Sequence, residues 1–169
     1  MFFYSGSYVL EDINPQWKVL LNGSVTIKFF VILNQVFLGK LMEDSIEIYE
    51  YRLNKGSFDY IQNISVQNGV SFTLLETEYS VYLVILEKFS GHFFGVSSRM
   101  YMYDPAKING VFDIYQPIYF KVYEPSAISG FEIYGKPYLA VVNKRNKGKK
   151  YNHNHFCKFT SGVLAYCVK

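Results

Sequence analysis

The stretch that decides the fold occurs twice, as G-S-F-D-Y-I-Q-N-I at Gly56–Ile64 and as G-V-F-D-I-Y-Q-P-I at Gly110–Ile118. The two glycines lie 54 residues apart. An apolar run also recurs, as K-F-F-V-I-L-N-Q at 28–35, V-Y-L-V-I-L-E-K at 81–88 and P-Y-L-A-V-V-N-K at 137–144, with spacings of 53 and 56 residues. A steady period of this length with several strand-like runs in each period predicts a repeat architecture of β-strands.

The composition agrees with strands throughout. Of the 169 residues, 50% are hydrophobic and 19% are aromatic, and such side chains suit a pleated surface that is buried on one or both faces. We therefore predict an all-β fold, a β-propeller-type repeat of four-stranded antiparallel blades. The net charge of +3 gives no indication of a nucleic-acid partner. Because no run of 18 uncharged apolar residues occurs, we expect no membrane-spanning helix.

The repeat divides the chain into units of one domain, at residues 1–35, 46–88 and 98–144, with a partial unit at 155–169. Strands are predicted at 17–21, 27–34, 46–52, 58–66, 70–76, 79–87, 99–104, 112–122, 128–134, 138–143, 155–159 and 162–169. The last strand of each full unit is nearly all apolar, so Val31, Val84 and Val141 should be among the least exposed residues. Residues 34–44 are predicted to form a loop.

The count is therefore three to three and a half blades, whereas closed propellers usually have about four to eight. Three interpretations stay open. The chain is a fragment, it completes a ring with another chain, or it ends in an open stack of blades. An open stack exposes apolar faces at both ends, so we expect self-association or dependence on missing flanking repeats.

The clearest single motif is F-E-I-Y-G-K-P-Y-L-A-V-V-N at residues 131–143. Together with the repeated F-D-x-x-Q-x-I and the tyrosine-rich runs at 48–51 and 100–103, it resembles the epilepsy-associated repeat, also called the EPTP repeat. Cys157 and Phe159 stand where that family has Tyr and Trp. The resemblance covers roughly residues 17–160. It implies a propeller, seven-bladed in the family, in a secreted protein that binds other extracellular proteins, including synaptic receptors, and that is not an enzyme.

The leading functional hypothesis is thus an extracellular protein–protein interaction module that binds a receptor or matrix partner. A sulfated-glycan-binding module of the same fold is the alternative, and a propeller-fold hydrolase is a third. We expect no cofactor, because no phosphate-binding loop, dinucleotide-binding or catalytic motif occurs. Carboxylates such as Glu43 and Asp44 form no cluster that is unique to one unit.

One loop is strongly basic. Between residues 144 and 150, five of seven residues carry positive charge. The loop is a candidate docking site for an acidic partner, such as a sulfated glycan or an acidic receptor face. The alternative is a solvated loop whose charge keeps an apolar domain soluble. The candidate ligand-binding residues are Lys144, Arg145, Lys147, Lys149 and Lys150.

The two cysteines, Cys157 and Cys167, fall on neighbouring predicted strands. They either form a disulfide, as in an oxidising compartment, or remain two buried thiols. His153 and His155 alternate along a strand, but His92 lies in another unit and supplies no third ligand, so we predict no metal site.

Two glycosylation sequons begin at Asn22 and Asn63. Residues 1–10 do not resemble a signal peptide, so an extracellular location requires a leader outside this chain.

Two polar residues recur at the same place in successive units. Asp59 matches Asp113, and Gln62 matches Gln116. A residue that returns in each unit is more often a hydrogen-bonding element of the repeat than a catalyst. We therefore assign these four residues a structural role.

Overall fold

The computed structural model describes residues 23–88, 96–107, 111–120, 125–143, 155–160 and 163–168. These segments contain no helix, and so none that could cross a membrane. They form twelve strands: β1 (Thr26–Ile32), β2 (Gln35–Leu41), β3 (Ser45–Arg52), β4 (Ser57–Ser65), β5 (Gly69–Glu76), β6 (Val81–Glu87), β7 (Val96–Asp104), β8 (Val111–Phe120), β9 (Pro125–Ile133), β10 (Lys136–Asn143), β11 (His155–Thr160) and β12 (Val163–Val168). The expectation of an all-β fold is confirmed.

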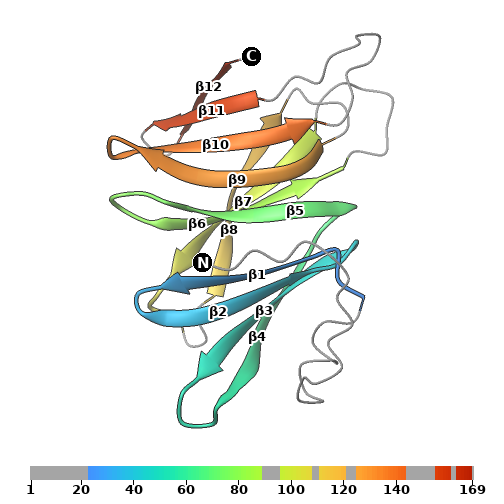
Figure 1. Cartoon of the computed structure of the whole chain (residues 1–169), viewed down its shortest axis with the longest axis vertical. Coiled ribbons are helices and arrows are strands. Elements are labelled where there is room, and N and C mark those ends of the chain that lie inside the picture. The colour runs from blue at the N-terminus through green and yellow to red at the C-terminus, as the bar shows by residue number, and fades with distance from the viewer. Residues whose placement is uncertain are drawn as a thin grey trace.

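The strands form three four-stranded sheets, in which each strand pairs antiparallel with the next along the chain. Sheet A contains β1–β4, sheet B contains β5–β8, and sheet C contains β9–β12. Figure 1 shows the sheets stacked with sheet B in the middle. Within the described residues the stack is open and does not close into a ring.

Two apolar layers hold the stack together, because each sheet presents alternate side chains to opposite faces. The layer between sheets A and B contains Ile32, Phe37, Leu41, Ile46, Ile48, Ile64, Val66, Phe72, Leu83, Ile85, Tyr101, Tyr103 and Phe112. The layer between sheets B and C contains Leu75, Tyr82, Val84, Leu86, Met100, Ile128, Leu139 and Val141.

Strand β6 contributes to both layers, so it is covered on its two faces. Six of its seven residues are buried. Val84 has no exposed surface, and neither does Val141 on β10. The prediction that the nearly all-apolar strands are the most buried is thus confirmed for β6 and for Val141.

The same prediction was wrong for the first unit. Val31 is 53% exposed, because it lies on β1, the first strand of sheet A, and points away from sheet B. The strand equivalent to β6 is β2, where Leu38 is fully buried. We had predicted residues 34–44 to be a loop, yet β2 occupies most of that range. A tight turn at Leu33–Asn34 reverses the chain and starts the strand that we missed.

The grouping of strands also differs from the predicted units. Sheets B and C each join the last two strands of one predicted unit to the first two strands of the next. Consequently β11 and β12 complete sheet C rather than begin another blade. Sheet A joins β1 and the unpredicted strand β2 to the first two strands of the second unit. The predicted strand at residues 17–21 lies outside the described residues.

The first strands of the three sheets lie side by side. Thr26 on β1 donates a hydrogen bond to the carbonyl oxygen of Val70 on β5, at 3.4 Å. The ammonium group of Lys28 on β1 donates to the carbonyl oxygens of Phe72 on β5 and Ile128 on β9. Later residues of β1 thus contact later residues of β5, so the two strands run in the same direction. The turns that follow the first strands thus lie at one end of the stack, as Figure 1 shows.

Candidate binding surface

The most exposed large hydrophobic side chains of the described residues all lie in turns at this end of the stack. We call the four residues the turn row. They follow the first strands of the three sheets and the third strand of sheet A. Their exposed fractions are 70% for Leu33, 89% for Leu53, 88% for Tyr79 and 97% for Tyr134. Exposed apolar side chains gathered at one end of a protein are typical of an interaction surface.

Two residues of the turn row have a left-handed backbone. Leu33 has a φ of 49° and Tyr134 a φ of 50°, and each is followed by a second residue of positive φ, Asn34 or Gly135. Such two-residue hairpin turns favour Asn, Asp or Gly at the first position. A bulky side chain there is uncommon and strains the backbone. Both turns thus bear an exposed hydrophobic side chain at a position where a small polar residue would fit better.

The turn that carries Tyr79 is fixed by the Thr77 hydroxyl group. This oxygen accepts hydrogen bonds from the backbone N–H groups of Tyr79 and Ser80, at 3.3 and 3.1 Å, and donates one to the Ser80 carbonyl oxygen at 2.9 Å. The Thr77 N–H also donates to that carbonyl. The hydroxyl group therefore holds the turn in one conformation and presents the tyrosine ring to solvent.

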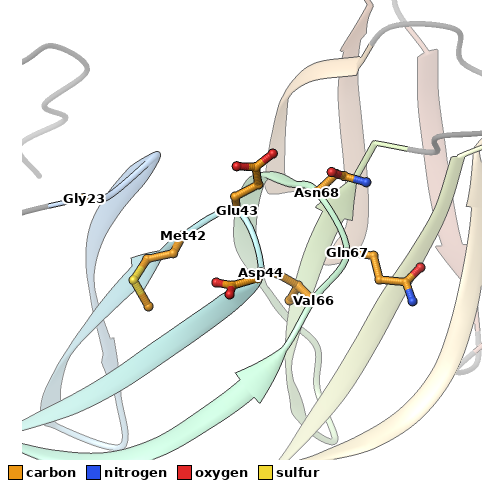
Figure 2. A pocket seen from close by; sticks show the side chains of 7 residues that line it. All are labelled: Gly23, Met42, Glu43, Asp44, Val66, Gln67 and Asn68. Carbon is orange, nitrogen blue, oxygen red and sulfur yellow. The ribbon is translucent and has the colours of Figure 1, made fainter.

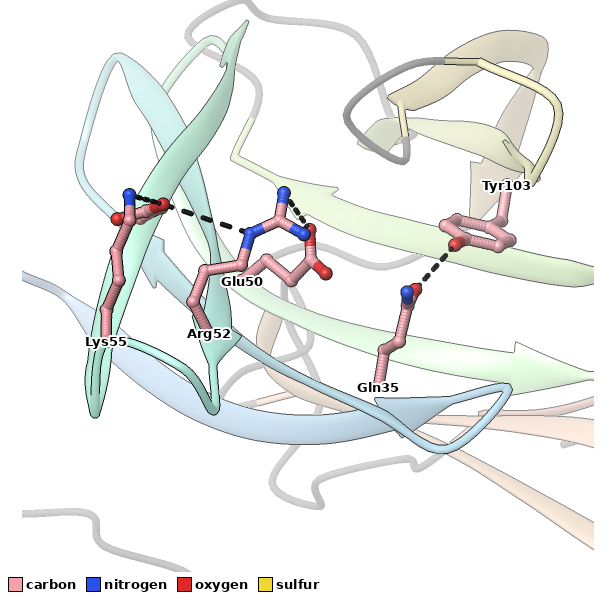
Figure 3. Close-up of polar contacts among 6 residues, drawn as sticks. Gln35, Glu50, Arg52, Lys55 and Tyr103 are labelled. Carbon is pink, nitrogen blue, oxygen red and sulfur yellow. Dashed lines mark hydrogen bonds and ion pairs between the residues drawn. The ribbon is translucent and has the colours of Figure 1, made fainter.

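Ion pairs fix the turn that carries Leu53. Arg52 pairs with the buried Glu50 at 2.8 Å, and Lys55 pairs with Asp59 at 2.6 Å, as Figure 3 shows in part. Arg52 also approaches Asp59, at 3.8 Å. The Arg52–Asp59 contact joins β3 to β4, the Lys55–Asp59 pair joins the turn to β4, and the Arg52–Glu50 pair lies within β3. Most of their energy is screened by solvent, so they orient the hairpin more than they stabilise the fold.

A polar contact joins sheets A and B next to the turn row. The Tyr103 hydroxyl group donates a hydrogen bond to the Gln35 side-chain oxygen at 3.5 Å (Figure 3). Burial, and then the Glu50 carboxylate, raise the pKa of Tyr103. The tyrosine therefore remains neutral and able to donate at physiological pH.

An open pocket of about 640 Å³ lies at the opposite end of the strands. Its walls come from the β2–β3 turn and from the β4–β5 connection (Figure 2). The backbone there is tied together, since Val66 N–H donates to the Asp44 carbonyl oxygen and Gly69 N–H to that of Glu43, each at 2.8 Å. The lining residues are Gly23, Met42, Glu43, Asp44, Val66, Gln67 and Asn68, so its charged side chains are both acidic. This acidic lining would suit a basic group.

A partly buried ion pair, between Arg99 and Glu87, lies next to the pocket residue Gln67. Both side-chain oxygens of Glu87 accept hydrogen bonds from Arg99, at 2.7 and 3.2 Å. One of them also accepts from the Gln67 backbone N–H at 2.7 Å. The hydrogen bonds that the Arg99 guanidinium donates to the Glu87 carboxylate raise the pKa of Arg99. The pair thus connects sheet B to the β4–β5 connection.

The repeated polar residues have the structural role that we predicted, as far as they are described. The Gln62 amide group donates to the Phe112 carbonyl oxygen and accepts from the Phe112 N–H, both at 2.8 Å, which joins sheet A to sheet B. Asp59 pairs with Lys55, and Asp113 pairs with Lys107 across the β7–β8 turn. The Gln116 side chain lies outside the described residues.

Other predicted site residues lie outside the described part of the chain. These are the basic-loop residues Lys144, Arg145, Lys147, Lys149 and Lys150, the sequon residue Asn22, and the histidines His92 and His153. Asn63 is exposed on β4, the edge strand of sheet A, where a glycan has room.

The backbone register pairs Cys157 with Cys167 directly across β11 and β12, although their side chains are not described. His155 begins β11, and its side chain is likewise outside the description. In the segments that the structure describes, no three metal-ligating side chains gather in one place.

Neither a scan against protein-family models nor a search of curated proteins found a match to this chain. The candidate function must therefore be argued from the geometry of the chain and from its own sequence.

Sequence reasoning missed the turn row, although a signal was present. Residues 30–38 read F-V-I-L-N-Q-V-F-L, and residues 131–139 read F-E-I-Y-G-K-P-Y-L. The two segments match in their aromatic, isoleucine and leucine positions, and each folds into a hairpin with a two-residue turn. An alignment of the two segments makes Leu33 equivalent to Tyr134, and it predicts a second strand, β2, after the turn. We had aligned the apolar run at 28–35 with the second strands of the later hairpins instead.

Proposed function

We propose that this chain is an extracellular protein–protein interaction module, built from propeller-type blades that correspond to sheets A, B and C. It docks on a receptor or matrix protein through the turn row. The observation that carries the proposal is the gathering of Leu33, Leu53, Tyr79 and Tyr134 at one end of the stack.

The chemistry of the turn row favours a protein partner. Tyrosine offers a large contact area with few rotatable bonds, and it is enriched among the residues that dominate binding energy at interfaces. The two-residue turns at Leu33 and Tyr134 and the hydrogen-bonded turn at Tyr79 fix the backbone that bears these side chains before binding. Preorganisation of this kind lowers the entropic cost of association.

The extracellular location rests on the sequence and on one feature of the register. The resemblance to the EPTP repeat implies secretion, and the opposed Cys157 and Cys167 suit an oxidising compartment. The consecutive four-stranded meanders, with their first strands side by side, support blades of propeller type.

A binding screen against an array of extracellular protein domains tests the proposal. The variant Leu33→Asn/Tyr79→Ser/Tyr134→Asn removes three exposed side chains, and asparagine suits the left-handed backbone, so the hairpins are retained. We expect this variant to lose at least about tenfold in affinity for any partner found. The matched control is Ile114→Thr, which removes a side chain that is 68% exposed on β8, outside the turns. Equal binding by the triple variant and the wild type would refute the role of the turn row.

A second candidate, binding of a sulfated glycan, is favoured by the five basic residues at 144–150. A glycan array probed with the wild type and with a charge-reversed loop separates the two functions. Glycan binding that disappears in the loop variant but persists in the turn-row variant would favour this second candidate.

A further inference from the structure

Sheet A has a face that points away from sheet B and is mostly apolar, apart from the ion pair between Lys40 and Glu47. Because Ile46 and Ile48 on β3 point into the layer between the sheets, Tyr49 and Tyr51 point outward. Register extends this outward face across all four strands, and it includes Phe29, Val31, Val36, Leu38, Tyr49, Tyr51, Phe58 and Tyr60. Val31 is 53% exposed, Val36 38% and Tyr60 56%, whereas Leu38, in the middle of the face, is fully buried.

Two sets of paired residues on this outward face match paired residues on the face of sheet B that points toward sheet A. In sheet A, the row of directly paired residues across β1–β4 is Phe29, Leu38, Tyr49 and Tyr60. In sheet B, the corresponding row across β5–β8 is Leu74, Leu83, Tyr101 and Ile114, of which Ile114, on the edge strand β8, is 68% exposed.

A neighbouring pair of residues repeats in the same way. Tyr51 pairs with Phe58 in sheet A, and Tyr103 pairs with Phe112 in sheet B. Leu83, Tyr101, Tyr103 and Phe112 of sheet B are at most 7% exposed, because sheet A covers them. The outward face of sheet A thus has the pattern of a face that another sheet covers.

The outward face of sheet C, which points away from sheet B, resembles the face of sheet A that packs against sheet B. On β9 and β10, Phe131 and Tyr138 are paired residues whose rings stack at 5.7 Å with an interplanar angle of 13°. The counterpart in sheet A is the Phe30–Phe37 pair, which stacks at 5.6 Å and 11°. That pair lies on the face of sheet A that packs against sheet B.

The next residues along β10 extend this match. Ala140 and Val142 follow Tyr138 on the same face, just as Gly39 and Leu41 follow Phe37 on β2. Val142 is 42% exposed, whereas Leu41 is fully buried against sheet B. The outward face of sheet C is therefore similar to the face with which sheet A covers sheet B.

We propose that a second copy of this chain covers the outward face of sheet A with the outward face of its sheet C. The contact would reproduce the packing between sheets A and B inside one chain. It joins two different surfaces, so it is a head-to-tail contact, which gives either a closed ring or an extending stack. The inference goes beyond the proposed function, since it concerns a self-contact on faces that the turn row does not use.

The test compares two variants of the full chain by sedimentation velocity over a range of concentrations. Val31→Glu places a charge on the outward face of sheet A, and Val142→Glu places one on that of sheet C. Both side chains are partly exposed in the single chain, so both variants should fold, which circular dichroism and thermal unfolding check. The control is Asn54→Glu, since Asn54 is exposed in the β3–β4 turn, outside either face and outside the turn row.

We expect the wild type and the control to associate as concentration rises. Each glutamate variant alone should associate at least about tenfold more weakly, because an unpaired charge is costly to bury. A mixture of the two variants should form a one-to-one dimer, because one copy keeps its sheet C face and the other keeps its sheet A face.

Three results would overturn the proposal. If the wild type stays monomeric at all concentrations, a second copy does not cover the outward face of sheet A, and another segment or another protein must do so. Association that Val31→Glu abolishes and Val142→Glu leaves intact indicates a symmetric contact between two sheet A faces. A mixture that remains monomeric excludes the head-to-tail arrangement.

Discussion

At the residue scale, the amide group of Gln62 shows how a repeated polar residue joins two sheets. It forms two hydrogen bonds of 2.8 Å with the backbone of Phe112, whose aromatic ring is buried in the layer between sheets A and B. A side-chain amide can replace a peptide group in this way because it offers one donor and one acceptor in the same plane. The contact sets the distance between β4 and β8, which belong to different sheets and are not joined through a shared neighbouring strand.

Replacing Gln62 with leucine should destabilise the fold by about 1–3 kcal/mol, since both Phe112 backbone groups lose their side-chain partner. Urea unfolding measures the change. Asn63→Leu, at the exposed neighbour on β4, is the control and should have little effect. Equal unfolding midpoints for the two variants would show that the amide does not hold the sheets together.

At the element scale, β5 and β9 approach so closely that one position excludes a side chain. The Gly130 N–H donates to the Thr73 hydroxyl oxygen at 2.9 Å. A Cβ atom built on Gly130 would lie 2.2 Å from the carbonyl oxygen of Leu74, far inside van der Waals contact. Because the obstructing atom belongs to the backbone of another strand, no rotamer change relieves the clash.

Gly130→Ala should therefore force β9 away from β5 and cost about 1–3 kcal/mol or more, as overpacking does in other cores. Ser129→Ala, one residue earlier on the exposed side of β9, provides the control. The measurement is the urea midpoint, and an alanine variant as stable as the wild type would contradict the close approach.

The pairing of β11 with β12 carries a second prediction at this scale. Residues directly opposite on antiparallel strands have Cα atoms about 4.5–5.5 Å apart, within the range of about 4.4–6.8 Å that a disulfide spans. Cys157 and Cys167 are opposite in this sense. We expect them to be bonded in protein made in an oxidising compartment, which would stabilise the fold by about 2–3 kcal/mol.

Mass spectrometry after alkylation, with and without prior reduction, checks the bond. The chain should take up alkyl groups at Cys157 and Cys167 only after reduction, and its melting temperature should then fall. Two thiols that react before reduction, in folded protein prepared without reductant, would argue against the disulfide.

At the scale of the whole molecule, the stacked sheets bury tyrosines whose ionisation opposes folding. Burial is the largest cause that raises the pKa of Tyr49, Tyr82, Tyr101 and Tyr103 above the usual 10.0. When the pH is below this usual pKa, the tyrosines are protonated in both the folded and the unfolded chain. Their ionisation then takes nothing from the free energy of unfolding. Above that pKa the unfolded chain loses protons that the folded chain keeps, and stability falls.

The free energy of unfolding should accordingly decrease as the pH rises beyond about 10, and the chain should unfold in alkali. Lys28 acts in the opposite direction, since burial lowers its pKa, but it is one group against four tyrosines. Urea unfolding at increasing pH, followed by tyrosinate absorbance, measures this. The variant Tyr103→Phe should weaken the dependence, and a stability that is constant through this range would contradict the burial of the tyrosines.

Local sequence accounts for which residues form most strands and for the alternation of side chains between the two faces of a strand. The repeated G-x-F-D segments became β4 and β8, and Ile46 and Ile48 share one face of β3, which points toward sheet B. The apolar run at 81–88 became β6, covered on both faces. These properties are local, because backbone alternation and apolar side chains act within a few residues.

Only the tertiary structure decided which strands share a sheet and which face of sheet A is exposed. A repeat period of about 54 residues is the same whichever strand is taken as the first of a unit. The repeat therefore could not show that the three sheets begin with β1, β5 and β9. Val31 resembles Val84 in its local sequence, yet it is exposed, because no part of sheet B faces it. Burial depends on the neighbour across the layer, and that neighbour is set by contacts between residues far apart in the chain.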